Sequence, residues 1–174
     1  MDRARFRDTV DAAVAFLYRE QESDGSWFGR WGTNYIYGTW SVLVAMETAG
    51  ESMRAPAIRR AVSWLESVQR PDGGWGEDNH SYFDQEKAGR AAFSTAYQTA
   101  WALLGLMAAG EVRSTAVSRG IAYLEQQQQT DGLWDDDSFT CPGFPRVFYL
   151  KYHGYTRYFP LWALARYRRL LKQT

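Results

Sequence analysis

The side chains whose type best suits acid chemistry are three consecutive carboxylates, Asp135–Asp137, which directly follow Trp134. A carboxyl group can act as a general acid when it is shielded from water and keeps its proton. Three adjacent carboxylates in a turn repel one another, so a solvated loop or the start of a helix suits them better than burial. We therefore expect no catalytic acid in this stretch.

Two histidines and one cysteine complete the set of candidate ligands and nucleophiles: His80, His153 and Cys141. Their spacing is not typical of a metal site, so we expect no metal and no cofactor. His80 lies in a polar stretch, where a histidine is normally solvated. A single cysteine cannot form an internal disulfide and fits a reducing compartment.

Aromatic side chains are unusually abundant in this chain. Eight Trp, eleven Tyr and nine Phe make up 16% of the residues, which is more than the packing of one core requires. The faces of aromatic rings attract cations without acting as nucleophiles. The surplus indicates a function that uses rings.

Three copies of one motif organise the sequence. Each copy has an aromatic–aliphatic pair, a Gln four residues after the aliphatic residue and a Trp six residues after the Gln; the pairs are Gln21 and Trp27, Gln69 and Trp75, and Gln128 and Trp134. Each copy also contains an Asp-Gly turn dipeptide. We expect these Gln and Trp residues to stabilise helix junctions, because a Gln amide can satisfy backbone groups of a neighbouring helix while its stem lies on the indole.

The spacing of the motifs gives the size of the repeat. The tryptophans lie 48 and 59 residues apart, and a polar insertion near His80–Arg90 accounts for the longer interval. One repeat is thus roughly fifty residues, enough for two helices and their turns.

Two kinds of helix alternate within the repeats. Residues 6–17, 58–68 and 117–124 carry apolar side chains at helical spacing opposite a charged face, which predicts helices with one side in water. Residues 35–49 and 94–109 are apolar around nearly the whole circumference and should be buried on all sides.

Helix ends can also be placed from the sequence. Gly50 and Gly110 stand where C-terminal caps are expected. A last helix should cover residues 159–170, with Pro160 in its first turn. We therefore expect three hairpins, each made of one outer and one inner helix. This is an all-α fold of the α/α toroid type.

Length and charge limit the remaining possibilities. The chain of 174 residues is 45% hydrophobic, and we expect one domain over residues 1–174. Twenty basic and twenty acidic side chains cancel, which removes the argument for binding nucleic acid through bulk charge. Without a leader or an apolar run of ~18 residues we expect a cytoplasmic protein. The locally basic residues 157–172 leave a peripheral membrane contact open.

The three motifs resemble the QW motifs of class II triterpene cyclases. Four stretches are similar to the squalene–hopene cyclase family: Gln21–Tyr37, Gln69–Glu77, Ser94–Leu104 and Gly143–Tyr167. The resemblance covers almost the entire chain but only the C-terminal part of the longer enzyme. Since that enzyme's catalytic domain is an (α/α)6 barrel, the chain should form about half of such a barrel.

The resemblance also implies a reaction. The family cyclises squalene to hopene or hopanol by protonating an alkene with the middle Asp of a DxDD motif, and no DxDD occurs here. Asp135–Asp137 aligns with an acidic turn of the family instead. The resemblance therefore implies no catalytic residue and no turnover by this chain alone.

The family's aromatic lining is retained in this sequence. The matching positions are Trp31, Tyr37, Phe144, Phe148, Tyr152 and Tyr155. By resemblance Phe144 and Phe148 stabilise cations of the later rings, and the others shape the pocket. Cys141-Pro142 and Tyr97 depart from the residues common in the family.

Three functions stay open. The chain could supply the C-terminal section of a squalene–hopene cyclase, with an apolar polyene such as squalene as ligand and a complementary N-terminal half as partner. It could be a module that binds isoprenoids and closes a ring as a homodimer. A prenyltransferase-type toroid would need zinc ligands, which the sequence lacks.

Overall fold

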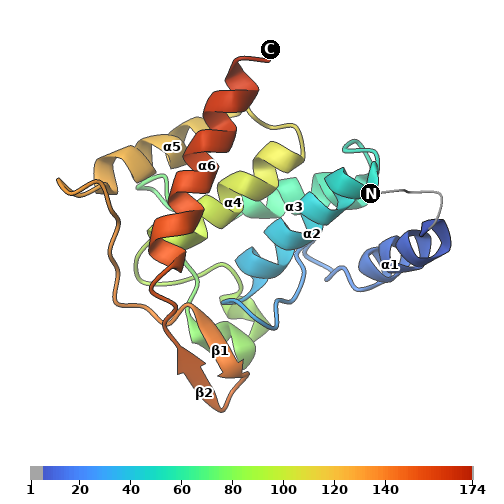
Figure 1. Cartoon of the computed structure of the whole chain (residues 1–174). Coiled ribbons are helices and arrows are strands. Elements are labelled where there is room, and N and C mark those ends of the chain that lie inside the picture. The colour runs from blue at the N-terminus through green and yellow to red at the C-terminus, as the bar shows by residue number, and fades with distance from the viewer. Residues whose placement is uncertain (1–5, 174) are drawn as a thin grey trace.

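A computed structural model describes residues 6–173 of the chain, and Figure 1 shows its arrangement. The elements of this part are α1 (Arg7–Arg19), α2 (Tyr35–Ala49), α3 (Pro56–Ser67), η1 (Asn79–Tyr82), η2 (Gln85–Lys87), α4 (Ala96–Ala108), α5 (Thr115–Gln127), β1 (Cys141–Phe144), β2 (Phe148–Leu150) and α6 (Tyr155–Leu171). The all-α prediction is confirmed for the framework, and the short sheet is an addition to it.

An inner layer of three helices carries the core. α4 packs against α2 on one side and against α6 on the other (Figure 1). Every residue of α4 is buried, as expected of a helix that is apolar all round. Gly105 allows close contact with α2, since a Cβ there would lie 3.0 Å from the Cα of Trp40. None of the helices described is long and apolar enough to cross a bilayer.

The outer helices α3 and α5 cover this layer. Both bury one face, including Ile58 and Leu65 of α3 and Val117 and Leu124 of α5. The prediction that one side faces water is confirmed for these two helices. Gly50 ends α2 with a φ of 81°, and Gly110 follows α4 with a φ of 89°, so both predicted helix ends are also confirmed.

α1 differs from the other outer helices. None of its residues is fully buried, and Phe16 is 49% exposed, so the expected face is packed only in part, through Val14, Leu17 and Tyr18. Figure 1 shows α1 at the edge of the molecule, where it packs against α2. A helix with a single inner neighbour covers only part of its apolar stripe, and this explains the difference.

α6 begins earlier than the sequence predicted. It starts at Tyr155, so Pro160 is the sixth helical residue and not part of the first turn. Proline has no N–H donor, and its ring crowds the carbonyl four residues earlier. The turn before it is held by the carbonyl of Gly154, which accepts from the N–H groups of Arg157 at 3.1 Å and Tyr158 at 2.8 Å.

A β-hairpin precedes α6 and was not predicted. β1 and β2 pair antiparallel, with a register irregularity between Pro142 and Phe144. In its turn Arg146 adopts a φ of 67°, unusual for a residue other than glycine. Arg146 Nε donates to the carbonyl of Tyr82 at 2.5 Å, and its guanidinium lies 5.8 Å from the centre of the Phe83 ring. These contacts fix the hairpin against η1.

Candidate functional site

The three tryptophans of the QW motifs form the same hydrogen bond. The indole Nε1 of Trp27, Trp75 and Trp134 donates to the carbonyl of the aliphatic motif residue ten positions earlier, at 2.7, 2.8 and 2.8 Å. All three indoles are buried. Each motif therefore closes the C-terminal end of an outer helix onto the following turn, which sets where the next inner helix begins.

The first two motifs also reach the following outer helix. Gln21 Nε2 donates to the carbonyls of Gly25 at 2.9 Å and Ala57 at 2.8 Å. Gln69 Nε2 donates to the carbonyls of Gly73 at 2.8 Å and Ala116 at 2.9 Å. The amides thus join each turn to the second residue of α3 or α5.

Two of the six expected lining residues contact one indole, and a third contacts one of those two. Trp101 contacts Tyr37 with ring centres 5.0 Å apart and Tyr155 with centres 5.7 Å apart. Tyr152 joins them through Tyr155 at 5.2 Å. The Tyr37 ring lies close against Gly32, since a Cβ there would be 2.2 Å from the ring. We call Tyr37, Trp101, Tyr152 and Tyr155 the tyrosine cluster.

The other expected residues lie on more exposed segments. Phe144 and Phe148 form an edge-on pair on the hairpin, with ring centres 5.6 Å apart, and are 63% and 44% exposed. A Cβ at Gly143 would lie 1.9 Å from the Phe148 ring, so this glycine allows the ring its position. Trp31 is 60% exposed and takes part in none of the ring pairs of the described residues.

Sequence reasoning missed Trp101 itself and the aromatic side chains that surround it. Trp101 is fully buried and also contacts Tyr97 at 4.9 Å and Phe159 at 5.4 Å. Trp40 stacks on it from α2 and touches Trp162 of α6. A signal was present, because a tryptophan recurs on each of the three inner helices.

Glu77 is a second residue that sequence reasoning missed. Its buried carboxylate accepts from the backbone N–H groups of Asn34, Tyr35 and Ile36 at 3.1, 3.1 and 2.9 Å. Burial raises the pKa of Glu77, and these N–H groups partly oppose that shift. The carboxylate caps the N-terminus of α2, which carries Tyr37.

The prediction that Asp135–Asp137 is fully hydrated is wrong for its middle residue. The side chains of Asp135 and Asp137 are exposed, whereas Asp136 is partly buried and one of its oxygens has no partner among the described residues. Burial raises the pKa of Asp136, against a backbone hydrogen bond from Ser138. Tyr97 of α4 donates its hydroxyl to the carbonyl of Phe139 at 3.2 Å, so the loop lies against α4 and its middle carboxylate is partly covered.

Glu77 does not suit alkene protonation, because both of its carboxylate oxygens accept from backbone N–H groups at the start of α2. One oxygen of Asp136 is likewise held, by the backbone N–H of Ser138.

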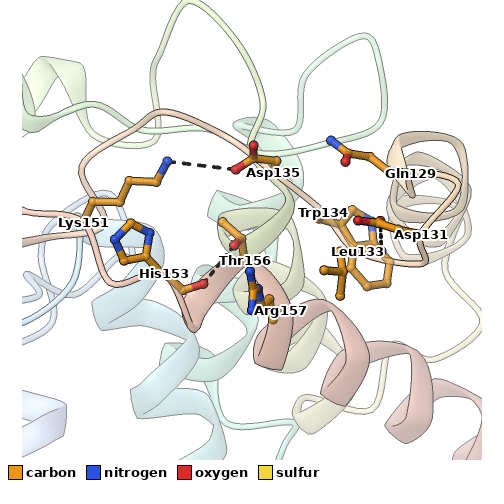
Figure 2. Close-up of a pocket in the computed structure, with 9 residues that line it drawn as sticks. All are labelled: Gln129, Asp131, Leu133, Trp134, Asp135, Lys151, His153, Thr156 and Arg157. Carbon is orange, nitrogen blue, oxygen red and sulfur yellow. Dashed lines mark hydrogen bonds and ion pairs between the residues drawn. The ribbon is translucent and has the colours of Figure 1, made fainter.

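A polar pocket of about 150 Å3 lies between the third QW turn and the start of α6 (Figure 2). Its lining includes Asp131 and Asp135 on one side and Lys151, His153 and Arg157 on the other. Lys151 pairs with Asp137 at 3.3 Å and with Asp135 at 4.0 Å. These charges do not suit an apolar polyene. Across residues 6–173 no group of three His, Cys, Asp or Glu side chains could hold a metal ion.

Known proteins place this arrangement in a family. The family model described as "Squalene-hopene cyclase C-terminal domain" matches residues 1–169. A probable squalene–hopene cyclase of Sinorhizobium fredii is 60% identical over 92% of this chain and 25% of its own length. The squalene–hopene cyclase of Alicyclobacillus acidocaldarius is 50% identical over 94% of this chain and 26% of its own.

Solved structures agree on the fold. The ent-copalyl diphosphate synthase of Streptomyces platensis aligns with a TM-score of 0.69 and 22% identity, over 96% of this chain and 29% of its own. The type II terpene cyclase MstE of Scytonema aligns with a TM-score of 0.58 and 23% identity, over 82% and 38%. The chain spans about a quarter of the length of the curated relatives it matches. It belongs to the squalene–hopene cyclase C-terminal domain family.

Proposed function

We propose that this chain supplies the aromatic, cation-stabilising wall of a squalene–hopene cyclase active site, and that the acid comes from another part of the cyclase. The supporting observation is the tyrosine cluster, in which ring faces gather without a carboxylate. Burial raises the pKa of Tyr155 to about 12, with further contributions from Tyr37, Cys141 and Tyr152. None of these neighbours carries a carboxylate.

The chemistry of polyene cyclisation explains why such a wall is useful. Positive charge passes from carbon to carbon, and an anion within reach would trap the cation or remove a proton from it. Aromatic faces stabilise a nearby cation by about 2 kcal/mol when both are desolvated. We assign this role to Phe144 and Phe148, and we assign shaping of the pocket to Trp31, Tyr37, Tyr152 and Tyr155.

The substrate assignment rests on relatives at 50–60% identity that are named squalene–hopene cyclases. We take squalene as the polyene, and a complementary cyclase region as the partner that brings the acid. The absence of a DxDD motif from this sequence supports an external acid.

A second candidate function is a module that binds isoprenoids and closes by dimerisation. Exposed apolar side chains on α6 favour a partner surface: Tyr158, Leu161 and Trp162. In that case squalene would bind without turnover, and the chain would form a symmetric dimer in solution.

Binding of a cation mimic tests the proposed wall without any need for the acid. The probes are a C30 polyene with a tertiary ammonium in place of one carbon and its neutral counterpart, titrated calorimetrically into the chain. We expect the ammonium to bind about tenfold more tightly. Equal binding of both probes, or binding of neither, would contradict the proposal.

A further inference from the structure

The tip of the β-hairpin (residues 143–148) contains the one non-glycine residue of the described chain with a positive φ. Arg146 adopts a φ of 67°, in the left-handed region that residues with a Cβ disfavour. The N–H of Val147 donates to the carbonyl of Phe144 at 3.0 Å and closes the turn around it. A disfavoured backbone conformation persists where surrounding contacts fix it. We therefore attribute the shape of the tip to the contacts of the Arg146 side chain.

The Arg146 side chain binds the tip to a well-anchored part of the core. Its Nε donates to the carbonyl of Tyr82 at 2.5 Å, and its guanidinium lies 5.8 Å from the centre of the Phe83 ring. Tyr82 is 1% exposed, and its hydroxyl donates to the carbonyls of Gly29 at 3.1 Å and Gly32 at 2.7 Å. The carbonyl that holds Arg146 thus belongs to a residue whose side chain is itself held by hydrogen bonds.

The base and the tip of the hairpin are attached at different places. At the base, the N–H of Thr33, just before α2, donates to the carbonyl of Thr140 at 3.2 Å. Among the hydrogen bonds of residues 6–173, the one from Arg146 is the only bond that joins residues 143–148 to a part of the chain outside the hairpin. The position of the tip relative to η1 accordingly depends on this side chain.

The tip carries the two rings to which we assign the stabilisation of cations. Phe144 and Phe148 pair across the turn, with ring centres 5.6 Å apart. They are 63% and 44% exposed, so packing against the core does little to hold them. Figure 1 shows the hairpin at the edge of the molecule. The place of both rings is therefore set by the backbone of the tip, and through it by Arg146.

The same contacts keep the guanidinium charge away from these two rings. Within the described residues, the guanidinium of Arg146 lies over Phe83 and over neither Phe144 nor Phe148. An arginine over either of those rings would compete with a carbocation for the same aromatic face. The anchored arginine thus leaves both rings to other cations.

We infer that Arg146 is a positioning residue of the cyclase wall: by anchoring the hairpin tip to η1, it sets where Phe144 and Phe148 face a developing cation. The inference rests on the proposed function for the role of the two rings, and on the geometry of the hairpin alone for the anchor. Arg146 acts through these rings and does not touch the substrate.

Arg146→Asn separates the guanidinium from the backbone conformation. Asparagine adopts a left-handed φ more readily than most residues with a Cβ, so the variant keeps the turn and loses the anchor. In this chain the protection of the Val147 amide against hydrogen exchange should fall by about tenfold. The Thr140 amide, which donates to the carbonyl of Leu150 at the base of the hairpin, should change by less than about twofold. Arg146→Lys keeps a cation and a donor and should retain more of the protection than Arg146→Asn.

Binding of the cation mimic shows whether the anchor positions the rings. The C30 ammonium polyene and its neutral counterpart are titrated into the wild type and the variants. We expect the preference for the ammonium to fall from about tenfold to about twofold in Arg146→Asn. Loss of a positive charge would by itself strengthen the binding of a cation, so a weaker preference reports displaced rings and not the altered charge. Val147→Ala, a change in the same tip at a residue that is 75% exposed, is the matched control and should keep the full preference.

Two results would overturn the inference. Unchanged protection of the Val147 amide in Arg146→Asn, with the variant folded by circular dichroism, would show that other contacts fix the tip. An unchanged or larger ammonium preference in that variant would show that Arg146 does not position the rings. Lack of any preference in the wild type would instead contradict the proposed function, and the exchange experiment would still decide whether Arg146 anchors the tip.

Discussion

Single side chains hold in place the helices that carry the aromatic lining. Glu77 holds the first turn of α2 through three N–H groups, and the pKa of its carboxyl is raised by burial. A carboxyl whose pKa is higher in the folded state binds more protons there, so folding stability falls as pH rises from its ordinary pKa to the raised one.

Glu77→Gln should remove this part of the pH dependence. An amide cannot ionise, although it retains one oxygen acceptor for the α2 N-terminus. As the pH rises from about 4.5 towards neutrality, the wild-type free energy of unfolding should therefore fall relative to that of the variant. Urea unfolding across this range measures the difference. Parallel profiles, or a wild-type advantage that grows with pH, would contradict the assigned direction.

Replacing Phe148 tests the proposed cation-stabilising role of the aromatic lining, also at the scale of one residue. In a cyclase assay with the acid-bearing region present, Phe148→Ala should lower complete cyclisation by about 30-fold, since a desolvated cation–π contact contributes about 2 kcal/mol. Incompletely cyclised products should accumulate, as chromatography with mass detection would show. Phe139→Ala, another exposed phenylalanine next to the hairpin, is the matched control. Equal losses from the two variants would argue against a cationic role.

At the scale of elements, sequence periodicity predicted the helices well because inner and outer helices differ in how far the apolar surface extends around them. The hairpin escaped prediction, since strands of four and three residues that include Pro142 and Gly143 have no clear alternation. Glu77 escaped because its partners lie 41–43 residues earlier in the chain. The resemblance named six lining residues, and the contacts that join Tyr37 and Tyr155 through Trp101, and Tyr152 through Tyr155, required coordinates.

The glycines of the QW turns give an element-scale prediction. All three adopt a left-handed φ, so alanine should cost about 1 kcal/mol at each. Gly73→Ala also places its Cβ 2.7 Å from a backbone carbonyl of α5, so its total cost should reach about 3 kcal/mol. Gly132→Ala places its Cβ against no helix, so it should cost only the about 1 kcal/mol that the left-handed φ requires. Urea unfolding of both variants measures these two losses of stability. Equal losses would show that a Cβ at Gly132 also meets neighbouring atoms.

At the scale of the whole molecule, the chain is a layer of inner helices covered by outer helices, with apolar side chains left open on α1, the hairpin and α6. Its relatives are about four times as long. Large exposed apolar areas are uncommon on soluble monomers and mark interaction surfaces. We expect a complementary cyclase region to cover them and to bring the acid.

Squalene turnover tests the central claim most directly. The chain is incubated with squalene alone and together with the remaining region of the Sinorhizobium fredii relative, and cyclised triterpenes are measured by gas chromatography with mass detection. We predict pentacyclic product only when both polypeptides are present. Product from this chain by itself, or none from an assembled pair whose acid-bearing half is folded, would contradict the division of acid and aromatic wall between them.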